Sequence, residues 1–286
     1  YGTANRANMK IELDVSLDPT LGCGQAHRWR RTDAGWQGVI GDDVVELVQT
    51  ADGFEAEGCS DKRRLLEYFR SEDDLPAILG SISSRDAYVA SLAGRCPGLR
   101  ILKQDGWECL ATYLLATNAN VKRIGGMVES VCETCGRNLG KRHAFPSPKE
   151  ILDRSESLGC CRLGFREKRF IELAERTENG DIDPVAIGEL DYGGCVNVLK
   201  DINGVGPKVA DCVALFGYGH LEAFPVDVRI QKVMEHVYGM TGSYRTLSEF
   251  GRARFGPFAG YAQELLYHSD FIRTDEPQTS GGYTPV

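Results

Sequence analysis

The segment "INGVGPKVADCVALFGYGHLEAFPVDVRI", residues 202–230, brings a glycine turn, a lysine and an aspartate together in one short run. Gly204 and Gly206 can adopt backbone angles that other residues avoid, and Pro207 suits the first position of a helix. A helix is therefore predicted to begin at Pro207. Its unpaired N–H groups, with the turn Gly204, Val205 and Gly206, would form an anion site that fits a backbone phosphate.

Two charged residues flank this predicted helix. Lys208 lies in its first turn, where the helix dipole should lower the lysine pKa and so prepare the amine as a nucleophile. Residues 224–226 are expected to be extended, because a residue before proline avoids helical angles. Asp227 then suits the N-cap of a second helix over 228–237, a position that keeps a carboxylate ionised.

Each feature alone has a structural explanation, since glycine turns, first-turn lysines and N-cap aspartates are common. Together, a turn that can bind a phosphate, a lysine amine prepared as a nucleophile and a carboxylate fixed at a helix start are what a DNA glycosylase with lyase activity needs. "GVGPKVADC" followed by "PVDV" resembles the helix-hairpin-helix glycosylase superfamily, and its 8-oxoguanine DNA glycosylase branch in particular. The resemblance continues in "SLDPTLGCGQAHRWRR", "ECLATYLLATNANVKRIGGMVESVC", "FPSPKEILDRSESLGCCRLGFREKRF" and "GPFAGYAQELLYHSDF", over roughly residues 11–272.

The resemblance implies an enzyme that flips 8-oxoguanine out of duplex DNA, excises it through a lysine Schiff base and nicks the strand by β-elimination. Lys208 would attack the anomeric carbon, and Asp227 would stabilise positive charge on the sugar. Asp211 is a rival carboxylate, but it is expected to support its own helix turn. Two alternatives stay open: a monofunctional glycosylase, whose relatives usually lack this lysine, and a non-catalytic helix-hairpin-helix DNA-binding protein.

The resemblance also implies a pocket for the damaged base. The Gly24 carbonyl would accept the N7 proton that 8-oxoguanine has and guanine lacks. Gln263 would read the pairing edge, and the base would lie between Cys212 and Tyr267, the latter departing from a commoner phenylalanine. From the residues alone, Gln263 and Tyr267 also fit an ordinary helix stripe.

A further group would contact the DNA duplex. Asn118 matches a wedge residue that fills the gap left by the flipped base, with Phe165 near it. Arg123 and Arg166, surface charges by the residues alone, match arginines that read the orphaned cytosine, so excision opposite cytosine is expected to be preferred. Arg229 stands where a histidine is common and would contact a phosphate.

Composition limits the other possibilities. The chain of 286 residues has a formal net charge of -8, unlike a general nucleic-acid scavenger, so DNA binding must use local patches such as 27–31 and 162–169. Its ten cysteines are scattered along the chain, so they predict reduced thiols inside a cell. The resemblance implies a DNA-associated protein, which is expected to be a monomer. A zinc site at Cys132 and Cys135, near His143, is conceivable, but no second cysteine pair has finger-like spacing, so no metal or cofactor is expected. No apolar run is long enough to span a membrane.

The pattern along the chain predicts an α+β fold. Residues 9–95 are expected to form a twisted antiparallel sheet domain with flanking helices, with alternation over 11–17 and strands at 36–40 and 44–48. Residues 96–273 are expected to be a helical catalytic region, with helices at 121–135 and 165–176, a loop at 177–184 and the hairpin at 199–216. Residues 1–8 are interpreted as a leader or expression remnant and 274–286 as a flexible tail.

Overall fold

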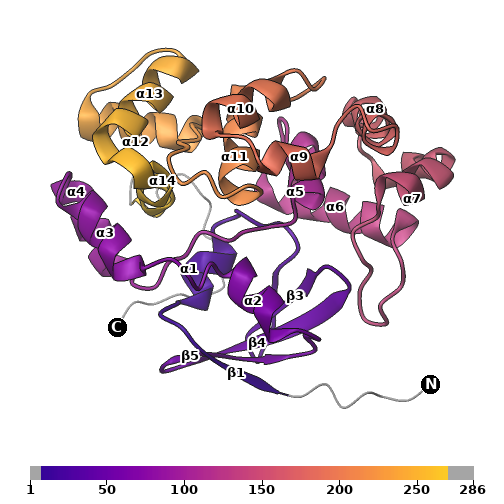
Figure 1. The fold of residues 1–286 in the computed structure, drawn as a ribbon, viewed down its shortest axis with the longest axis horizontal. Helices are drawn as coiled ribbons and strands as arrows, with labels where there is room; N and C mark the ends of the chain where they lie inside the picture. Colours follow the sequence, from indigo (N-terminus) through magenta and orange to yellow (C-terminus); the bar gives the residue numbers. More distant parts are fainter. Residues whose placement is uncertain (1–7, 270–286) are drawn as a thin grey trace.

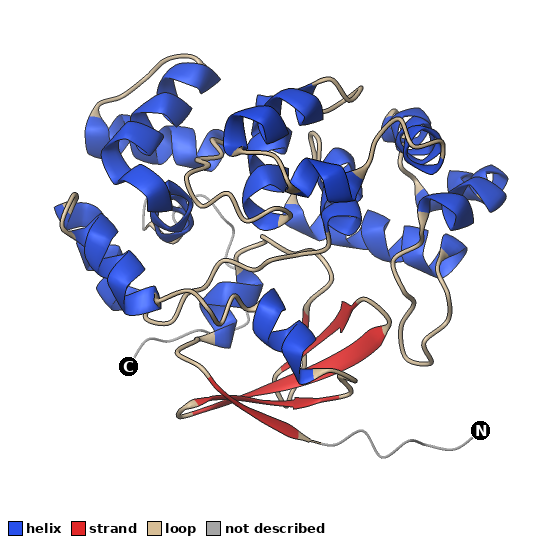
Figure 2. Cartoon of the chain, viewed as in Figure 1, coloured by secondary structure: helices blue, strands red, loops and turns tan. Residues whose placement is uncertain are grey.

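The computed structural model describes residues 8–269. A small sheet lies along one side of the molecule and a larger body of helices covers it (Figure 1). Coloured by secondary structure, the strands gather in this one region and helices make up nearly all of the rest (Figure 2). The predicted α+β class, a sheet followed by a helical region, is confirmed. Residues 1–7 of the expected leader and the expected tail lie outside the described residues.

The sheet has five antiparallel strands in the order β1-β5-β4-β3-β2. The strands are β1 (Met9–Glu12), β2 (Arg30–Arg31), β3 (Trp36–Ile40), β4 (Asp43–Thr50) and β5 (Gly53–Glu57). Strand β3 has the predicted bounds, whereas β5 was not specified from the sequence. The alternation over 11–17 does not extend the ladder, because β1 ends at Glu12 and Ser16 N–H instead donates to the Gly98 carbonyl at 2.8 Å.

Helices form the rest of the described chain. Helix α6 has the predicted bounds, and α8 runs two residues into the expected loop at 177–184. They are α1 (Leu17–Gly22), α2 (Lys62–Tyr68), α3 (Leu75–Ser83), α4 (Ala87–Arg95), α5 (Gly106–Leu115), α6 (Val121–Cys135), α7 (Pro148–Asp153), α8 (Arg166–Glu178), α9 (Pro184–Gly188), α10 (Tyr192–Lys200), α11 (Pro207–Phe216), α12 (Val228–Tyr238), α13 (Tyr244–Phe255) and α14 (Ala259–Tyr267), with 3-10 turns η1 (Ser155–Cys161) and η2 (Gly256–Phe258).

Two buried clusters hold these parts together. The smaller cluster lies where α2 packs on the sheet, and the rings of Phe54 and Phe69 contact each other there at a tilt of 45°, with centroids 4.8 Å apart. The larger cluster is formed by the helices, and it includes residues of α3 and α4 such as Ile82 and Leu92. Helices α3 and α4 therefore share the core of the helical body, and a domain boundary after residue 95 stays a prediction.

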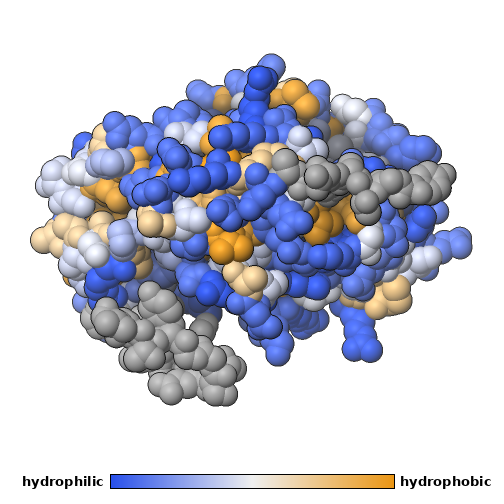
Figure 3. Space-filling model, turned by 90° about the horizontal axis from the view of Figure 1, so that it is seen from below, coloured by the Kyte–Doolittle hydropathy of each residue, from blue (hydrophilic) through white to orange (hydrophobic). Residues whose placement is uncertain are grey.

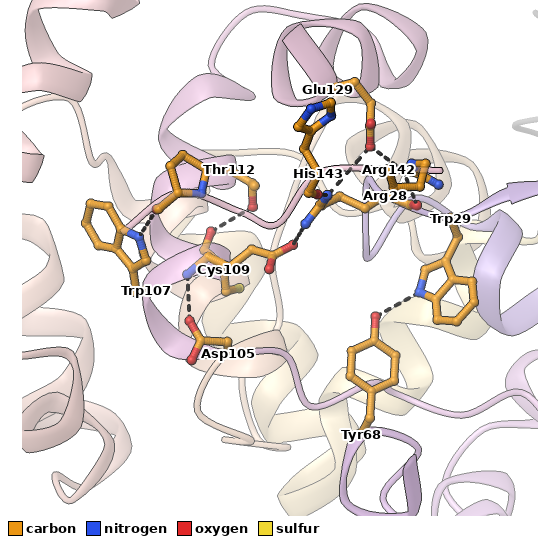
Figure 4. A network of polar contacts seen from close by, with 12 residues as sticks. Arg28, Trp29, Tyr68, Asp105, Trp107, Cys109, Thr112, Glu129, Arg142 and His143 are labelled. Atoms are coloured by element: carbon orange, nitrogen blue, oxygen red, sulfur yellow. Dashed lines mark hydrogen bonds and ion pairs between the residues drawn. The ribbon is translucent and has the colours of Figure 1, made fainter. Parts of the chain in front are cut away.

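A buried polar network joins the sheet side to the helices (Figure 4). Arg28 lies 3.6 Å from Glu129 of α6 and 3.7 Å from Glu108 of α5, while Arg142 donates to Glu129 and, at 3.1 Å, to the Arg28 carbonyl. The expectation that 27–31 offers a local patch for DNA binding is therefore wrong for Arg28, which is 3% exposed and pairs with acidic residues. Burial, opposed mainly by the nearby Arg28 charge, raises the pKa of Glu108 to about 7.

The molecular surface is mostly polar. In the view from below, hydrophilic residues cover most of the face and apolar side chains form separate patches (Figure 3). Within residues 8–269, no helix combines the length and apolar character that a membrane crossing requires.

Candidate active site

The predicted hairpin is formed by α10, a tight turn and α11, which begins at Pro207 as expected. Gly204 has a φ of +91°, which residues with a side chain rarely adopt, and a Cβ there would lie 2.7 Å from Arg169 Cδ. Both the backbone angle and the lack of space therefore favour glycine at this position. Gly206 is the N-cap of α11 and no side chain caps the helix. The turn residues Gly204, Val205 and Gly206 line an open surface groove that Lys200 also lines. This arrangement suits an anion, and phosphate binding by Gly204, Val205 and Gly206 stays a prediction.

Behind this turn, one cavity of about 120 Å³ brings together six of the predicted residues. They come from four places in the fold: the segment after α1, the first turns of α11, the N-cap of α12, and α14. The six residues are Gly24, Lys208, Cys212, Asp227, Gln263 and Tyr267. The sequence therefore identified the walls of this cavity, although the residues span most of the chain.

Lys208 extends into the cavity from α11. Its Nζ lies 5.3 Å from the centroid of the Tyr113 ring, a distance at which the ring attracts an ammonium group. Cys212, one helical turn further along, and Asp227 raise the Lys208 pKa, while burial lowers it. The prediction of a lowered Lys208 pKa is therefore wrong for the free protein, because the interactions with Cys212 and Asp227 outweigh burial. The amine is therefore protonated at rest and must lose a proton before it can attack.

Asp227 is the predicted N-cap, and this is confirmed. Its Oδ1 accepts hydrogen bonds from the N–H groups of Arg229 at 3.0 Å and Ile230 at 2.8 Å. These bonds stabilise the carboxylate and fix its position in the cavity wall. The same residue therefore begins α12 and presents a negative charge to the region of Lys208.

The rival carboxylate, Asp211, is occupied elsewhere. Its Oδ1 accepts from the Tyr192 hydroxyl at 2.6 Å, and its Oδ2 accepts from the hydroxyls of Tyr244 and, at 3.2 Å, Ser248. The expectation that Asp211 supports its own helix turn is wrong, because it joins α11 to α10 and α13. It does not line the cavity.

Gly24 belongs to a segment that is held firmly in place. It has a φ of +92°, and a Cβ on it would lie 3.3 Å from Val121 Cγ2. The buried side chain of the next residue, Gln25, donates to the Thr20 carbonyl at 2.8 Å and the Arg100 carbonyl at 2.9 Å, and accepts from Leu102 N–H at 2.8 Å. These bonds fix the loop that carries Gly24.

The opposite wall of the cavity comes from α14. Gln263 is buried, and its Oε1 has no hydrogen-bond partner among the described residues. The Tyr267 hydroxyl accepts from Arg229 Nη1 at 2.6 Å, and the Arg229 guanidinium lies 5.1 Å from the Tyr267 ring centroid. Arg229 therefore lies beside the base-pocket ring, outside the hairpin groove, and its expected phosphate contact stays a prediction.

The cavity wall also contains titratable residues that were missed from the sequence, among them Cys23, His27 and Glu264. Both ring nitrogens of His27 are buried and have no hydrogen-bond partner among residues 8–269, and burial together with Lys208 lowers the His27 pKa to about 4. His27 was hidden in the apparent basic patch. Glu264 had a usable signal, because an acidic residue inside an otherwise apolar helical stripe is unusual.

The predicted DNA-contacting residues lie together outside the cavity. Asn118 is exposed with a φ of +53°, a left-handed conformation that non-glycine residues seldom adopt. Phe165 is 54% exposed, with the guanidinium groups of Arg166 and Arg169 at 4.4 and 5.6 Å from its ring centroid. Arg123 is exposed on the first turn of α6.

Arg166 differs from the expectation of a surface charge, because it is only 2% exposed. Its Nε donates to the Thr117 carbonyl at 2.8 Å, Nη1 donates to the Leu163 carbonyl at 3.2 Å, and Nη2 donates to the Asn118 carbonyl at 3.1 Å. In the free protein this guanidinium therefore holds the turn that presents Asn118. Reading of a cytosine by Arg166 stays a prediction.

The cysteines of the chain are all free thiols. Burial raises the pKa of Cys132 to about 12 and that of Cys135 to about 11. Across residues 8–269, no group of three or more histidine, cysteine or acidic side chains is placed to hold a metal ion.

Comparison with known proteins agrees with this geometry. Residues 9–110 match the family model for the N-terminal domain of 8-oxoguanine DNA glycosylase. The chain is 30% identical to the N-glycosylase/DNA lyase OGG1 of Arabidopsis thaliana over 294 residues, covering 93% of this chain and 80% of that protein.

Solved structures extend the similarity to the whole fold. The apo 8-oxoguanine glycosylase/lyase of Clostridium acetobutylicum superimposes with a TM-score of 0.86 at 29% identity, covering 92% of this chain and 98% of that one. The same enzyme in complex with double-stranded DNA containing cytosine opposite 8-oxoguanine gives a TM-score of 0.84 at 28% identity, covering 92% and 96%. The chain belongs to the 8-oxoguanine DNA glycosylase family of the helix-hairpin-helix superfamily.

Proposed function

We propose that this protein is a bifunctional repair enzyme that excises 8-oxoguanine from double-stranded DNA and then cleaves the strand. The observation that carries the proposal is the single cavity that holds Lys208, Asp227 and the predicted base-binding residues. The relatives named above as glycosylases and lyases support the same pair of activities. Its partner is double-stranded DNA, and its proposed location is intracellular and DNA-associated.

In the proposed mechanism, Lys208 attacks C1′ of the flipped nucleotide as the bond to the base breaks. Asp227 stabilises the positive charge that develops on the sugar, because its carboxylate is fixed by the α12 cap. The resulting Schiff base then allows elimination of the 3′ phosphate. The Gly24 carbonyl and the unpartnered Gln263 Oε1 supply acceptors for the base, and Tyr267 supplies a stacking surface.

Preference for cytosine opposite the lesion is the finer part of the proposal. Arg123 is exposed beside the Asn118 turn, so it can donate two hydrogen bonds to the acceptor edge of an orphaned cytosine. Arg166 can do the same only where DNA binding moves the turn that it now holds. Asn118 and Phe165 would fill the space left in the duplex.

Borohydride trapping on a duplex with 8-oxoguanine opposite cytosine tests the proposal. The wild type should be trapped covalently, and Lys208→Gln should lose trapping while still binding the duplex. Lys149→Gln is the matched control, because it removes the same charge from an exposed position on α7 that lines neither the cavity nor the hairpin groove, and it should still be trapped. Trapping of Lys208→Gln at the wild-type level would remove Lys208 from the mechanism. Excision by the wild type without any trapped product would favour a monofunctional glycosylase, and binding without excision would favour a non-catalytic DNA-binding protein.

A further inference from the structure

Glu264 is a buried acidic residue in the cavity to which the mechanism above gives no role. It is 4% exposed, it lines the same cavity as Lys208, and its Oε2 is buried without a hydrogen-bond partner in residues 8–269. Carboxylates are almost never fully buried unless they are paired. A buried carboxyl oxygen left without a partner beside a reacting amine therefore calls for a chemical explanation.

The titratable groups around Glu264 come from each element that forms the cavity. After burial, the largest influence on its pKa is a hydrogen bond from the Cys23 thiol, in the segment after α1, and the charges of Asp227 and Lys208 act on it from α12 and α11. The other titratable groups lining the cavity are Cys212 on the Lys208 face, His27, Tyr113 and Tyr267. Lys208 and Glu264 influence each other, because each favours the charged form of the other.

These groups differ in their ability to accept a proton near neutral pH. Burial raises the pKa of Glu264 to about 7. Burial, which outweighs the nearby Lys208, also raises the pKa of Cys212, to about 12, far above the working pH. Burial together with Lys208 lowers the pKa of His27 to about 4, so a proton on its ring is held weakly. A group that must both accept and return a proton works best with a pKa near the working pH.

We propose that Glu264 takes the proton from the resting Lys208 ammonium and returns it to the departing base. The inference rests on the proposed function, because it assumes that Lys208 is the nucleophile. It adds a group that neither the glycine hairpin nor the Asp227 cap supplies.

The proton and electron balance closes without another reactant. The ionised Glu264 carboxylate accepts one proton from Lys208, directly or through one water, and leaves a neutral amine. The Nζ–C1′ bond forms as the C1′–N9 bond breaks, and the electron pair of the broken bond stays on the base. Protonated Glu264 then donates its proton to a ring nitrogen of that base, which leaves neutral, and the carboxylate is regenerated.

Glu264→Gln tests the inference, because glutamine keeps the shape of the side chain but cannot carry a proton. The readout is the single-turnover rate of base excision between pH 6 and 9, measured with saturating protein. At pH 7 the rate should fall by about 10²- to 10⁴-fold, the usual contribution of general acid–base catalysis. The difference in rate between the variant and the wild type should shrink as the pH rises, since hydroxide then deprotonates Lys208 in place of the carboxylate.

Glu108→Gln is the matched control. It removes another carboxyl whose pKa is raised to about 7, but one that is half-buried in the Arg28 network outside this cavity. Its excision rate and pH profile should follow the wild type. If Glu264→Gln does not fold, Glu264→Ala with added formate replaces it, and formate should restore excision in proportion to its concentration.

Three outcomes would overturn the inference. The first is an unchanged rate and pH profile in Glu264→Gln. The second is a loss of equal size at every pH, which would indicate a role in shape alone, and the third is a failure of formate to restore Glu264→Ala. Trapping of the wild type but not of Lys208→Gln would leave the proposed function standing in each case.

Discussion

Replacing Asp211 by asparagine should destabilise the fold and leave the chemistry intact. The carboxylate accepts hydrogen bonds from Tyr192, Tyr244 and Ser248, and it is 3% exposed. Hydrogen bonds to a charged group contribute roughly 1.5–3 kcal/mol each. An asparagine NH₂ replaces one of the two accepting oxygens, and rotation of a hydroxyl recovers part of the loss. We therefore expect the free energy of unfolding to fall by about 2–4 kcal/mol.

For a chain of this size, that loss corresponds to a decrease in Tm of about 5–15 °C. Thermal unfolding followed by circular dichroism measures it. Single-turnover excision is then measured well below both midpoints, where Asp211→Asn should stay within a few-fold of the wild type. Asp227→Asn should lose orders of magnitude in rate under the same conditions, because its charge acts on the developing cation. An Asp211→Asn protein that is fully folded and as slow as Asp227→Asn would refute this reading of the two carboxylates.

Three other outcomes follow from the geometry. Gly24→Ala should weaken binding of 8-oxoguanine duplexes and lower the free energy of unfolding by about 1–3 kcal/mol, because the φ of Gly24 is +92°. Titration of the variant with lesion and guanine duplexes checks this. An unchanged preference for the lesion duplex would count against a role for the Gly24 carbonyl. Arg123→Ala should flatten the preference among the four opposite bases. Arg166→Ala should slow excision opposite all four alike, because loss of this guanidinium frees the Asn118 turn. Single-turnover rates on the four duplexes measure both effects, and a preference retained by Arg123→Ala would indicate that Arg123 only contacts a phosphate. Glu264 has a pKa of about 7 in the folded state and about 4.5 in the unfolded chain, so between these pH values the folded state keeps a proton that the unfolded chain releases. The free energy of unfolding therefore falls as the pH rises from about 4.5 to about 7, and the loss stays constant above pH 7. Glu264→Gln should remove this decrease and gain up to about 3 kcal/mol over the wild type at pH 8 but little at pH 4, as measured by urea unfolding; an equal difference at both pH values would contradict the assignment.

Local signals gave the helix starts at Pro207 and after Asp227, because proline and an N-cap aspartate act within their own turn. The cavity needed the family resemblance, since Gly24 and Gln263 are far apart in the sequence and no local pattern joins them. Burial was the harder property to predict. Arg28 and Arg166 read as surface charges because their partners, two glutamates and a set of backbone carbonyls, lie many residues away.

The resting charge of Lys208 was missed for the same reason. A helix end is visible in the sequence, but the effects of Cys212 and Asp227 on the pKa depend on how α11 and α12 pack. Glu264 was passed over because its neighbours on α14 matched a simple helix stripe. In each case the error arose from a partner brought close by tertiary structure.

The hydrogen bonds around Gln25 have a consequence for how a base is inspected. They hold the Gly24 loop in one conformation before any DNA arrives, so its conformational entropy is lost during folding and not during binding. If the Gly24 carbonyl reads the base as proposed, a normal guanine and a damaged one meet the same conformation of this loop. Discrimination on this side of the cavity would then depend on whether the base presents a hydrogen-bond donor to that carbonyl, without any rearrangement of the Gly24 loop.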